Sequence, residues 1–144
     1  TLFVPHGVGG FVSQTDGSLS LANILIPVTG KPRAQPAVDA SARLIRVLDL
    51  APGTVTLLHV GSEGDMPALK IPGDTNFHWQ RWTRAGSPVE TILEAAAELS
   101  ADLIAMTTDG PDGFLDGLRG TTSERVLQRA DCPVACLPVG SLLG

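Results

Sequence analysis

Short apolar segments alternate with amphipathic ones along most of this chain, and the alternation limits the fold more than any other feature. Residues 24–28 and 55–60 are apolar runs of strand length. Between them, apolar residues recur at helical spacing from about 36 to 48. Strands joined through helices pair in parallel, because the crossover returns the chain to the same end of the sheet. The sequence therefore predicts an α/β fold with an open parallel sheet and helices on both faces.

The second half of the chain repeats this alternation. Ser87, Pro88 and Glu90 have the pattern of an N-cap, a first helical residue and a capping-box partner, so a helix is predicted to begin there. Residues 61–76 are rich in Gly, Pro, Asp and Ser and predict an irregular connection. The other strands predicted in this half are residues 77–84, 103–106 and 133–137.

A loop with two glycines leads from the strand 103–106 into a helix. The loop contains Gly110 and Gly120, and Thr121 with Glu124 forms a capping box that predicts the helix start at Thr121. A helix N-terminus presents unpaired backbone N–H groups, and glycine lets the backbone approach an anion closely. The loop therefore predicts an anion site, such as one for phosphate. The alternative is that both glycines only shape a tight connection.

Two predicted loops leave the carboxyl ends of strands. One is Pro27-Val28-Thr29-Gly30, and the other is the glycine loop. In open parallel sheets, ligands bind beyond the carboxyl ends of the strands, where the strand order reverses. The two loops are therefore expected to form the walls of a single site, in which Thr29 serves as a ligand hydroxyl or only as a turn residue.

The composition suits a globular domain and argues against some partners. Of the 144 residues, 43% are hydrophobic and 17% charged, which fits one domain with a substantial core. The formal net charge of −5 offers no electrostatic attraction to nucleic acid or to an anionic membrane. No apolar run approaches the roughly 20 residues that a membrane-spanning helix needs.

Residues of the kinds that catalyse reactions or bind metals are few and scattered. The sequence holds no G-x-S-x-G or H-E-x-x-H motif, so we expect neither an enzyme nor a metal site. His59 lies in an apolar strand and is interpreted as a core histidine. Along a strand, Cys132 and Cys136 would be roughly 13 Å apart, too far for a disulfide. Both are therefore expected to be free thiols of a cytoplasmic protein.

The first residues of the chain do not follow the alternation. Residues 11–14 and 18–21 flank Thr15-Asp16-Gly17, which predicts a hairpin. We therefore treat residues 1–21 as an extension, with a hairpin or edge strand, and residues 22–144 as the α/β domain.

A short similarity links the two ends of the chain. Phe3-Val4-Pro5-His6-Gly7 is similar to Cys136-Leu137-Pro138-Val139-Gly140. The similarity indicates the last strand of a preceding unit, which would make this chain the second half of a tandem protein. The alternative is an extra edge strand whose similarity arises by chance.

The chain resembles the universal stress protein family over about residues 22–139. The segments that carry the resemblance are Ile24-Leu25-Ile26-Pro27-Val28, Leu57-Leu58-His59-Val60, Gly86-Ser87-Pro88, Ala101-Asp102-Leu103-Ile104, Gly110 with Gly120-Thr121, Ser123-Glu124-Arg125-Val126-Leu127 and Cys132-Pro133-Val134. The resemblance implies five parallel strands in the order 3-2-1-4-5. It also implies a nucleotide site, with the adenine and ribose surrounded by Pro27, Val28, Thr29, Val60, Met106 and Thr107. The phosphates would lie against Gly110, Gly120, Thr121 and Thr122.

The same resemblance implies two functions. The first is a stress-response domain that binds an adenine nucleotide such as ATP or AMP, with Mg²⁺ in some cases, and whose bound state alters its associations. The second is a family member that binds no nucleotide and acts as a dimerising interaction module, through the last strand at 133–137. Thr29 and Thr107 favour the second function, because the family commonly has Asp at the position of Thr29 and Gly at the position of Thr107. Gly110 and Gly120 favour the first.

Overall fold

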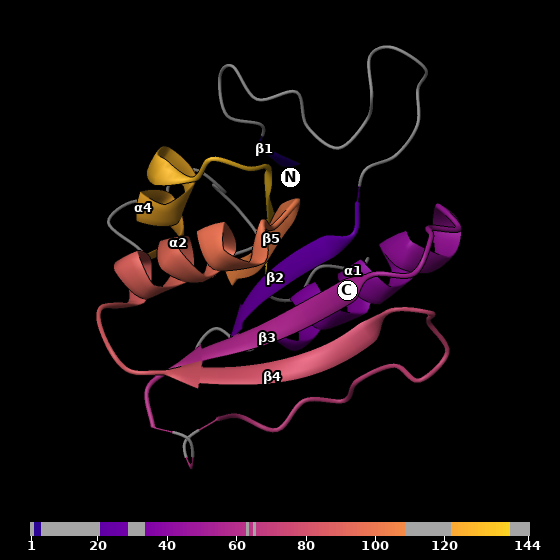
Figure 1. The fold of residues 1–144 in the computed structure, drawn as a ribbon, viewed down its shortest axis with the longest axis horizontal. Helices are drawn as coiled ribbons and strands as arrows, with labels where there is room; N and C mark the ends of the chain where they lie inside the picture. Colours follow the sequence, from indigo (N-terminus) through magenta and orange to yellow (C-terminus); the bar gives the residue numbers. More distant parts are fainter. Residues whose placement is uncertain are drawn as a thin grey trace.

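The domain is built around a six-stranded sheet in the order β1-β6-β5-β2-β3-β4 (Figure 1). The computed structural model describes residues 2–3, 21–28, 34–62, 64, 66–108 and 122–138. The strands are β1 (Leu2–Phe3), β2 (Asn23–Val28), β3 (Thr54–Val60), β4 (His78–Arg84), β5 (Leu103–Thr108) and β6 (Val134–Pro138). The helices are α1 (Gln35–Val47), α2 (Pro88–Leu99) and α4 (Thr122–Arg129).

The parallel part of the sheet confirms the predicted strand order. Counted along the chain from β2 to β6, the five parallel strands lie side by side in the order 3-2-1-4-5. The sixth strand, β1, runs antiparallel against β6 and is the expected edge strand. The hairpin predicted over 11–21 lies, except for Leu21, outside the described residues.

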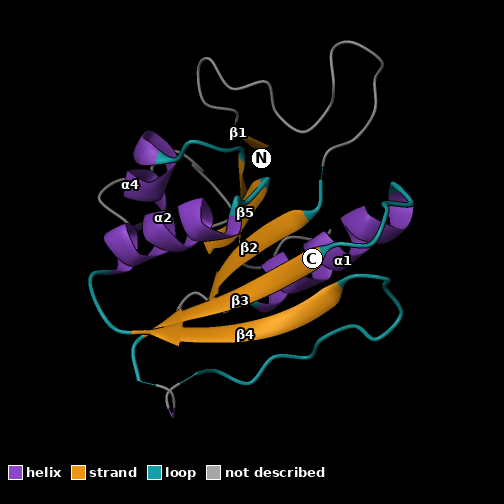
Figure 2. Ribbon diagram, viewed as in Figure 1, coloured by secondary structure: helices purple, strands orange, loops and turns teal. Residues whose placement is uncertain are grey.

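Two hydrophobic cores form on opposite faces of the sheet. Helix α1 covers one face of the sheet, and α2 and α4 cover the other (Figure 2). Ile24 and Val28 of β2 belong to the core under α1, whereas Leu25 belongs to the core under α2 and α4. Side chains alternate between the faces of a strand, so a strand covered on both faces must be apolar at nearly every position. This is why β2 reads as an unbroken apolar run and could be predicted from the sequence.

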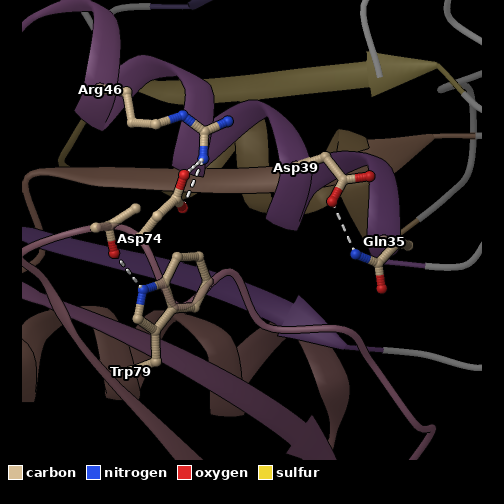
Figure 3. A network of polar contacts seen from close by, with 6 residues as sticks. Gln35, Asp39, Arg46, Asp74 and Trp79 are labelled. Carbon is tan, nitrogen blue, oxygen red and sulfur yellow. Dashed lines mark hydrogen bonds and ion pairs between the residues drawn. The ribbon is translucent and has the colours of Figure 1, made fainter.

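Polar contacts hold the irregular connection between β3 and β4 against α1 (Figure 3). The Arg46 guanidinium lies 2.9 and 3.2 Å from the two carboxylate oxygens of Asp74. Gln35 accepts a hydrogen bond from the backbone N–H of Lys70 at 2.9 Å and donates one to its carbonyl at 3.0 Å. The Trp79 indole N–H donates to the Thr75 hydroxyl at 3.0 Å. Residues 66–77 therefore follow a defined path although they form no helix or strand.

The capping box predicted at the start of α2 is wrong. Ser87 is the N-cap and Pro88 the first helical residue, as expected, but the Ser87 side chain makes no capping hydrogen bond. The Glu90 carboxylate instead accepts two hydrogen bonds from the Arg129 guanidinium of α4, one of them at 3.1 Å. A bidentate pair with a guanidinium is stronger than a bond to one neutral N–H, so Glu90 is drawn away from the helix end.

The Glu90–Arg129 pair is expected to make stability depend on pH. The hydrogen bond from Arg129 holds the pKa of Glu90 below its ordinary value of 4.5. The stabilisation is therefore complete above pH 4.5 and is lost as the pH falls through the lower pKa of the folded state. Urea unfolding of wild type and Glu90→Gln at pH 7 and pH 3 tests this. The difference in free energy of unfolding between wild type and Glu90→Gln should be smaller at pH 3 than at pH 7. A difference that is the same at both pH values would contradict this prediction.

Candidate ligand site at the carboxyl edge of the sheet

The strand order reverses at β2, which lies between β3 and β5. From β2 the chain builds outward on one side through β3 and β4, and then returns to build the other side through β5 and β6. Helices α1 and α4, which follow β2 and β5 along the chain, pack on opposite faces of the sheet. The carboxyl edge at this reversal is the position at which open parallel sheets bind ligands, as the sequence predicted.

Pairing between β2 and β5 stops before the carboxyl edge. β2 pairs with β3 along its whole length, up to Val28 opposite His59. With β5 it pairs only at Ile24↔Leu103 and Leu25↔Ile104. Beyond those two pairs, the described residues of β2 and β5 are joined by no further ladder pair. The ladder between these two central strands therefore ends well before their carboxyl ends.

Most of the predicted site residues that the structure describes lie at this edge. They are Pro27 and Val28 at the end of β2, Val60 at the end of β3, and Met106 and Thr107 near the end of β5. Thr122 is the first residue of α4, one position later than the predicted helix start. The other four predicted residues, Thr29, Gly110, Gly120 and Thr121, lie outside the described residues.

The side chains at this edge divide between the two faces. Val28 belongs to the core under α1, and Met106 to the core under α2 and α4, with Val60 packed against the latter. Met106 is only 5% exposed. The Met106 side chain therefore belongs mainly to the core. Its backbone faces the part of β2 that makes no ladder pair with β5.

Two buried polar atoms flank Val28 without hydrogen-bond partners among the described residues: His59 Nε2 and Thr107 Oγ1. His59 and Thr107 are each 8% exposed. His59 Nδ1 lies 3.1 Å from the carbonyl oxygen of Val28 and so carries the proton, which leaves Nε2 as an acceptor. An unpaired buried polar atom costs about 1–3 kcal/mol. The two atoms are the kind of group that a bound polar ligand pairs with.

The interpretation of His59 as a core histidine is confirmed for one ring nitrogen only. Gly61 lies against the other: a Cβ placed on it would be 2.9 Å from His59 Nε2. Sequence reasoning missed His59 and the Thr107 hydroxyl as a pair. The available signal was their place at the ends of two strands, on the same face by the alternation of side chains.

An open groove of about 720 Å³ lies along the α1 side of β4. It is lined by Met66, Pro67, Ala68, Arg81 and Thr83. Thr83 is the register partner of His59, so the groove borders the carboxyl edge near β3. The exposed Arg81 gives this border a positive charge.

Metal-binding and reactive groups are scarce in the described ranges. There, no group of three or more His, Cys, Asp and Glu side chains is placed to hold a metal ion. Cys132 and Cys136 form no disulfide, as expected, and burial raises the pKa of both thiols to about 11. No described helix is both long and apolar enough to cross a membrane.

Comparison with known proteins agrees with this geometry. Residues 79–138, which include β5, α4 and β6, match the model of the universal stress protein family. Over this part of the chain, the sequence resembles the universal stress protein family. Universal stress protein MJ0531 of Methanocaldococcus jannaschii is 45% identical over 49 residues, which are 34% of this chain and 29% of that protein.

Solved structures share the fold at lower identity. A universal stress protein from Archaeoglobus fulgidus aligns with a TM-score of 0.62 and 21% identity, over 83% of this chain and 45% of its own. A universal stress protein from the same organism in complex with dAMP aligns with a TM-score of 0.53 and 18% identity, over 80% of this chain and 96% of that chain. The chain thus spans less than half of the curated relative and of the first structure.

Proposed function

We propose that this domain binds an adenine nucleotide at the carboxyl edge around Val28, and that the bound state controls its association with other proteins during stress. The observation that carries the proposal is the pair of buried, unpartnered atoms on either side of Val28, His59 Nε2 and Thr107 Oγ1. They lie where the strand order reverses and the β2–β5 ladder has ended. The related A. fulgidus protein with bound dAMP supports the choice of ligand.

The proposed contacts divide between two ends of the ligand. Pro27, Val28, Val60, Met106 and Thr107 supply the surroundings of the base and ribose. There, a ribose hydroxyl or the exocyclic amino group of adenine would donate a hydrogen bond to the two unpartnered atoms, His59 Nε2 and Thr107 Oγ1. Thr122 opens α4, whose N-terminal N–H groups favour phosphate oxygens. Thr29, Gly110, Gly120 and Thr121 complete the proposed set. We assign binding rather than catalysis to these residues, and Mg²⁺ would enter only as the counter-ion of a bound ATP.

Calorimetric titration with ATP, AMP and cyclic AMP, each with and without Mg²⁺, tests the proposal. We expect binding of at least one nucleotide, and about tenfold weaker binding by Thr107→Val, because one hydrogen bond of roughly 1.4 kcal/mol is removed without a change of shape. Thr54→Val, at the opposite edge of β3, is the matched control and should bind as wild type does. No heat from any nucleotide at millimolar concentration would reject the proposal.

A second function, association without nucleotide, is favoured by a separate observation. The outer edge of β6, through which a homodimer was expected, carries the short antiparallel strand β1. The edge therefore accepts an added strand in this structure. We propose that association through β6 persists even if the titrations show no binding, which makes the two functions separable by experiment.

A further inference from the structure

β4 forms one edge of the sheet, and no described strand pairs with its outer side (Figure 1). At its start, the N–H of His78 donates to the Gly53 carbonyl at 2.8 Å, on the β3 side. At its end, the carbonyl of Arg84 accepts from the Gly61 N–H at 2.8 Å, again on the β3 side. Successive residues of a strand turn their hydrogen-bonding groups to alternate sides. The groups that point outward therefore belong to Trp79, Arg81 and Thr83.

The connection that precedes β4 leaves these outward groups without a backbone partner. Met66, Leu69 and Ile71 of the connection pack against the core under α1, so the connection crosses the α1 face and does not extend the sheet. Among the described residues, no backbone hydrogen bond joins the connection to β4. An edge strand with free N–H and carbonyl groups readily accepts a further strand.

The side chains of the same outward residues form a surface beside this edge. Trp79 packs against the core under α1, on the same face as Arg81 and Thr83 because side chains alternate along a strand. Arg81 and Thr83 line the open groove of about 720 Å³, whose other lining residues are Met66, Pro67 and Ala68. A strand added to β4 would place every second side chain along this groove.

The charges of β4 favour an acidic partner over a second copy of the strand. β4 contains no Asp or Glu. The Arg84 guanidinium lies 4.3 Å from the centre of the Trp82 ring and donates to Glu98 of α2 at 2.5 Å. Arg81 is exposed and has no ion pair among the described residues. Two copies of β4 that paired antiparallel about the middle residue would set Arg81 against Arg81, and like charges directly opposite are destabilising.

We propose that the outer edge of β4 is a docking site for an extended segment of a partner protein, which adds as a further strand and carries an acidic side chain opposite Arg81. In strand addition, backbone hydrogen bonds supply the affinity and alternate side chains supply the specificity. Apolar residues two positions before and after the acidic one would lie along the groove. The inference goes beyond nucleotide binding and does not depend on it.

A peptide with blocked ends and the sequence Thr-Val-Thr-Glu-Thr-Val-Thr is the probe for this site. Both tryptophans of the chain lie in β4, so their fluorescence reports binding at this strand. We expect a saturable change in emission, and about fivefold weaker binding by Arg81→Glu. A peptide with lysine in place of glutamate should have the opposite preference and bind Arg81→Glu more tightly than wild type. Arg125→Glu, on the exposed side of α4, is the matched control and should bind as wild type does.

N-methylation of the peptide separates strand addition from attraction between charges alone. Methyl groups on one alternate set of amides should abolish binding, because those amides would face β4, and methyl groups on the other set should leave binding intact. Equal effects of the two sets would overturn the proposal. So would the absence of a saturable change at millimolar peptide, or the same preference for the glutamate peptide in wild type and Arg81→Glu. If the melting transition of Arg81→Glu is lost, Arg81→Gln replaces it and should bind the two peptides equally.

Discussion

Gly53→Ala is expected to lower the free energy of unfolding by about 3 kcal/mol. A Cβ on Gly53 would lie 2.3 Å from the carbonyl oxygen of Ala22 and 2.8 Å from the Phe77 ring. Neither neighbour can retreat easily. The Ala22 carbonyl accepts a hydrogen bond from Thr54 at 2.7 Å, and the Gly53 carbonyl accepts one from His78 at 2.8 Å. The methyl group must therefore displace the backbone where β2, β3 and β4 begin.

Gly73→Ala is the control for this prediction. A Cβ on Gly73 would meet no atom within 4 Å, so the substitution should change stability by no more than about 0.5 kcal/mol. Urea unfolding of both variants gives the comparison. Equal stabilities for the two would show that the contact at Gly53 relaxes without strain.

Asp102→Ala is expected to lower the free energy of unfolding by about 2 kcal/mol. One carboxylate oxygen of Asp102 accepts the backbone N–H groups of Ala22 at 2.8 Å and of Asn23 at 2.9 Å. The Asp102 N–H donates in turn to the Asn23 carbonyl at 2.7 Å. These bonds join the starts of β2 and β5, which pair at only two positions, so few other contacts replace them.

Asp102→Asn shows how much of this loss comes from the negative charge of the carboxylate and how much from its hydrogen-bond geometry. Its amide oxygen can still accept a backbone N–H but lacks the negative charge, so about half of the loss should appear. Chemical unfolding at pH 7 measures all three proteins. An alanine variant as stable as wild type would show that water satisfies these N–H groups equally well.

The fold could be predicted because its signals are local. β2 is covered on both faces, so nearly every one of its residues is apolar and the strand can be recognised from the sequence. The start of α2 was predicted correctly from Ser87 and Pro88, since an N-cap and a first-turn proline act within a few residues.

The partners of individual side chains could not be predicted, because they come from distant parts of the chain. Glu90 pairs with Arg129, which is 39 residues away, rather than with its own helix end. Asp102 binds a backbone N–H 80 residues earlier. The orphaned atoms of His59 and Thr107 become visible only when β2 is placed between their strands. For Glu90 and Asp102, no local pattern in the sequence identifies the partner.

The partial burial of Cys132 and the full burial of Cys136 determine how these thiols should react with oxidants. Peroxides react with the thiolate, and a thiol whose pKa is about 11 is almost entirely protonated near pH 7, at roughly one thiolate in ten thousand. Both sulfurs are thus poor targets for sulfenic acid formation or glutathionylation. An oxidant pulse that modifies an exposed, acidic cysteine is therefore expected to leave both sulfurs of this domain unchanged.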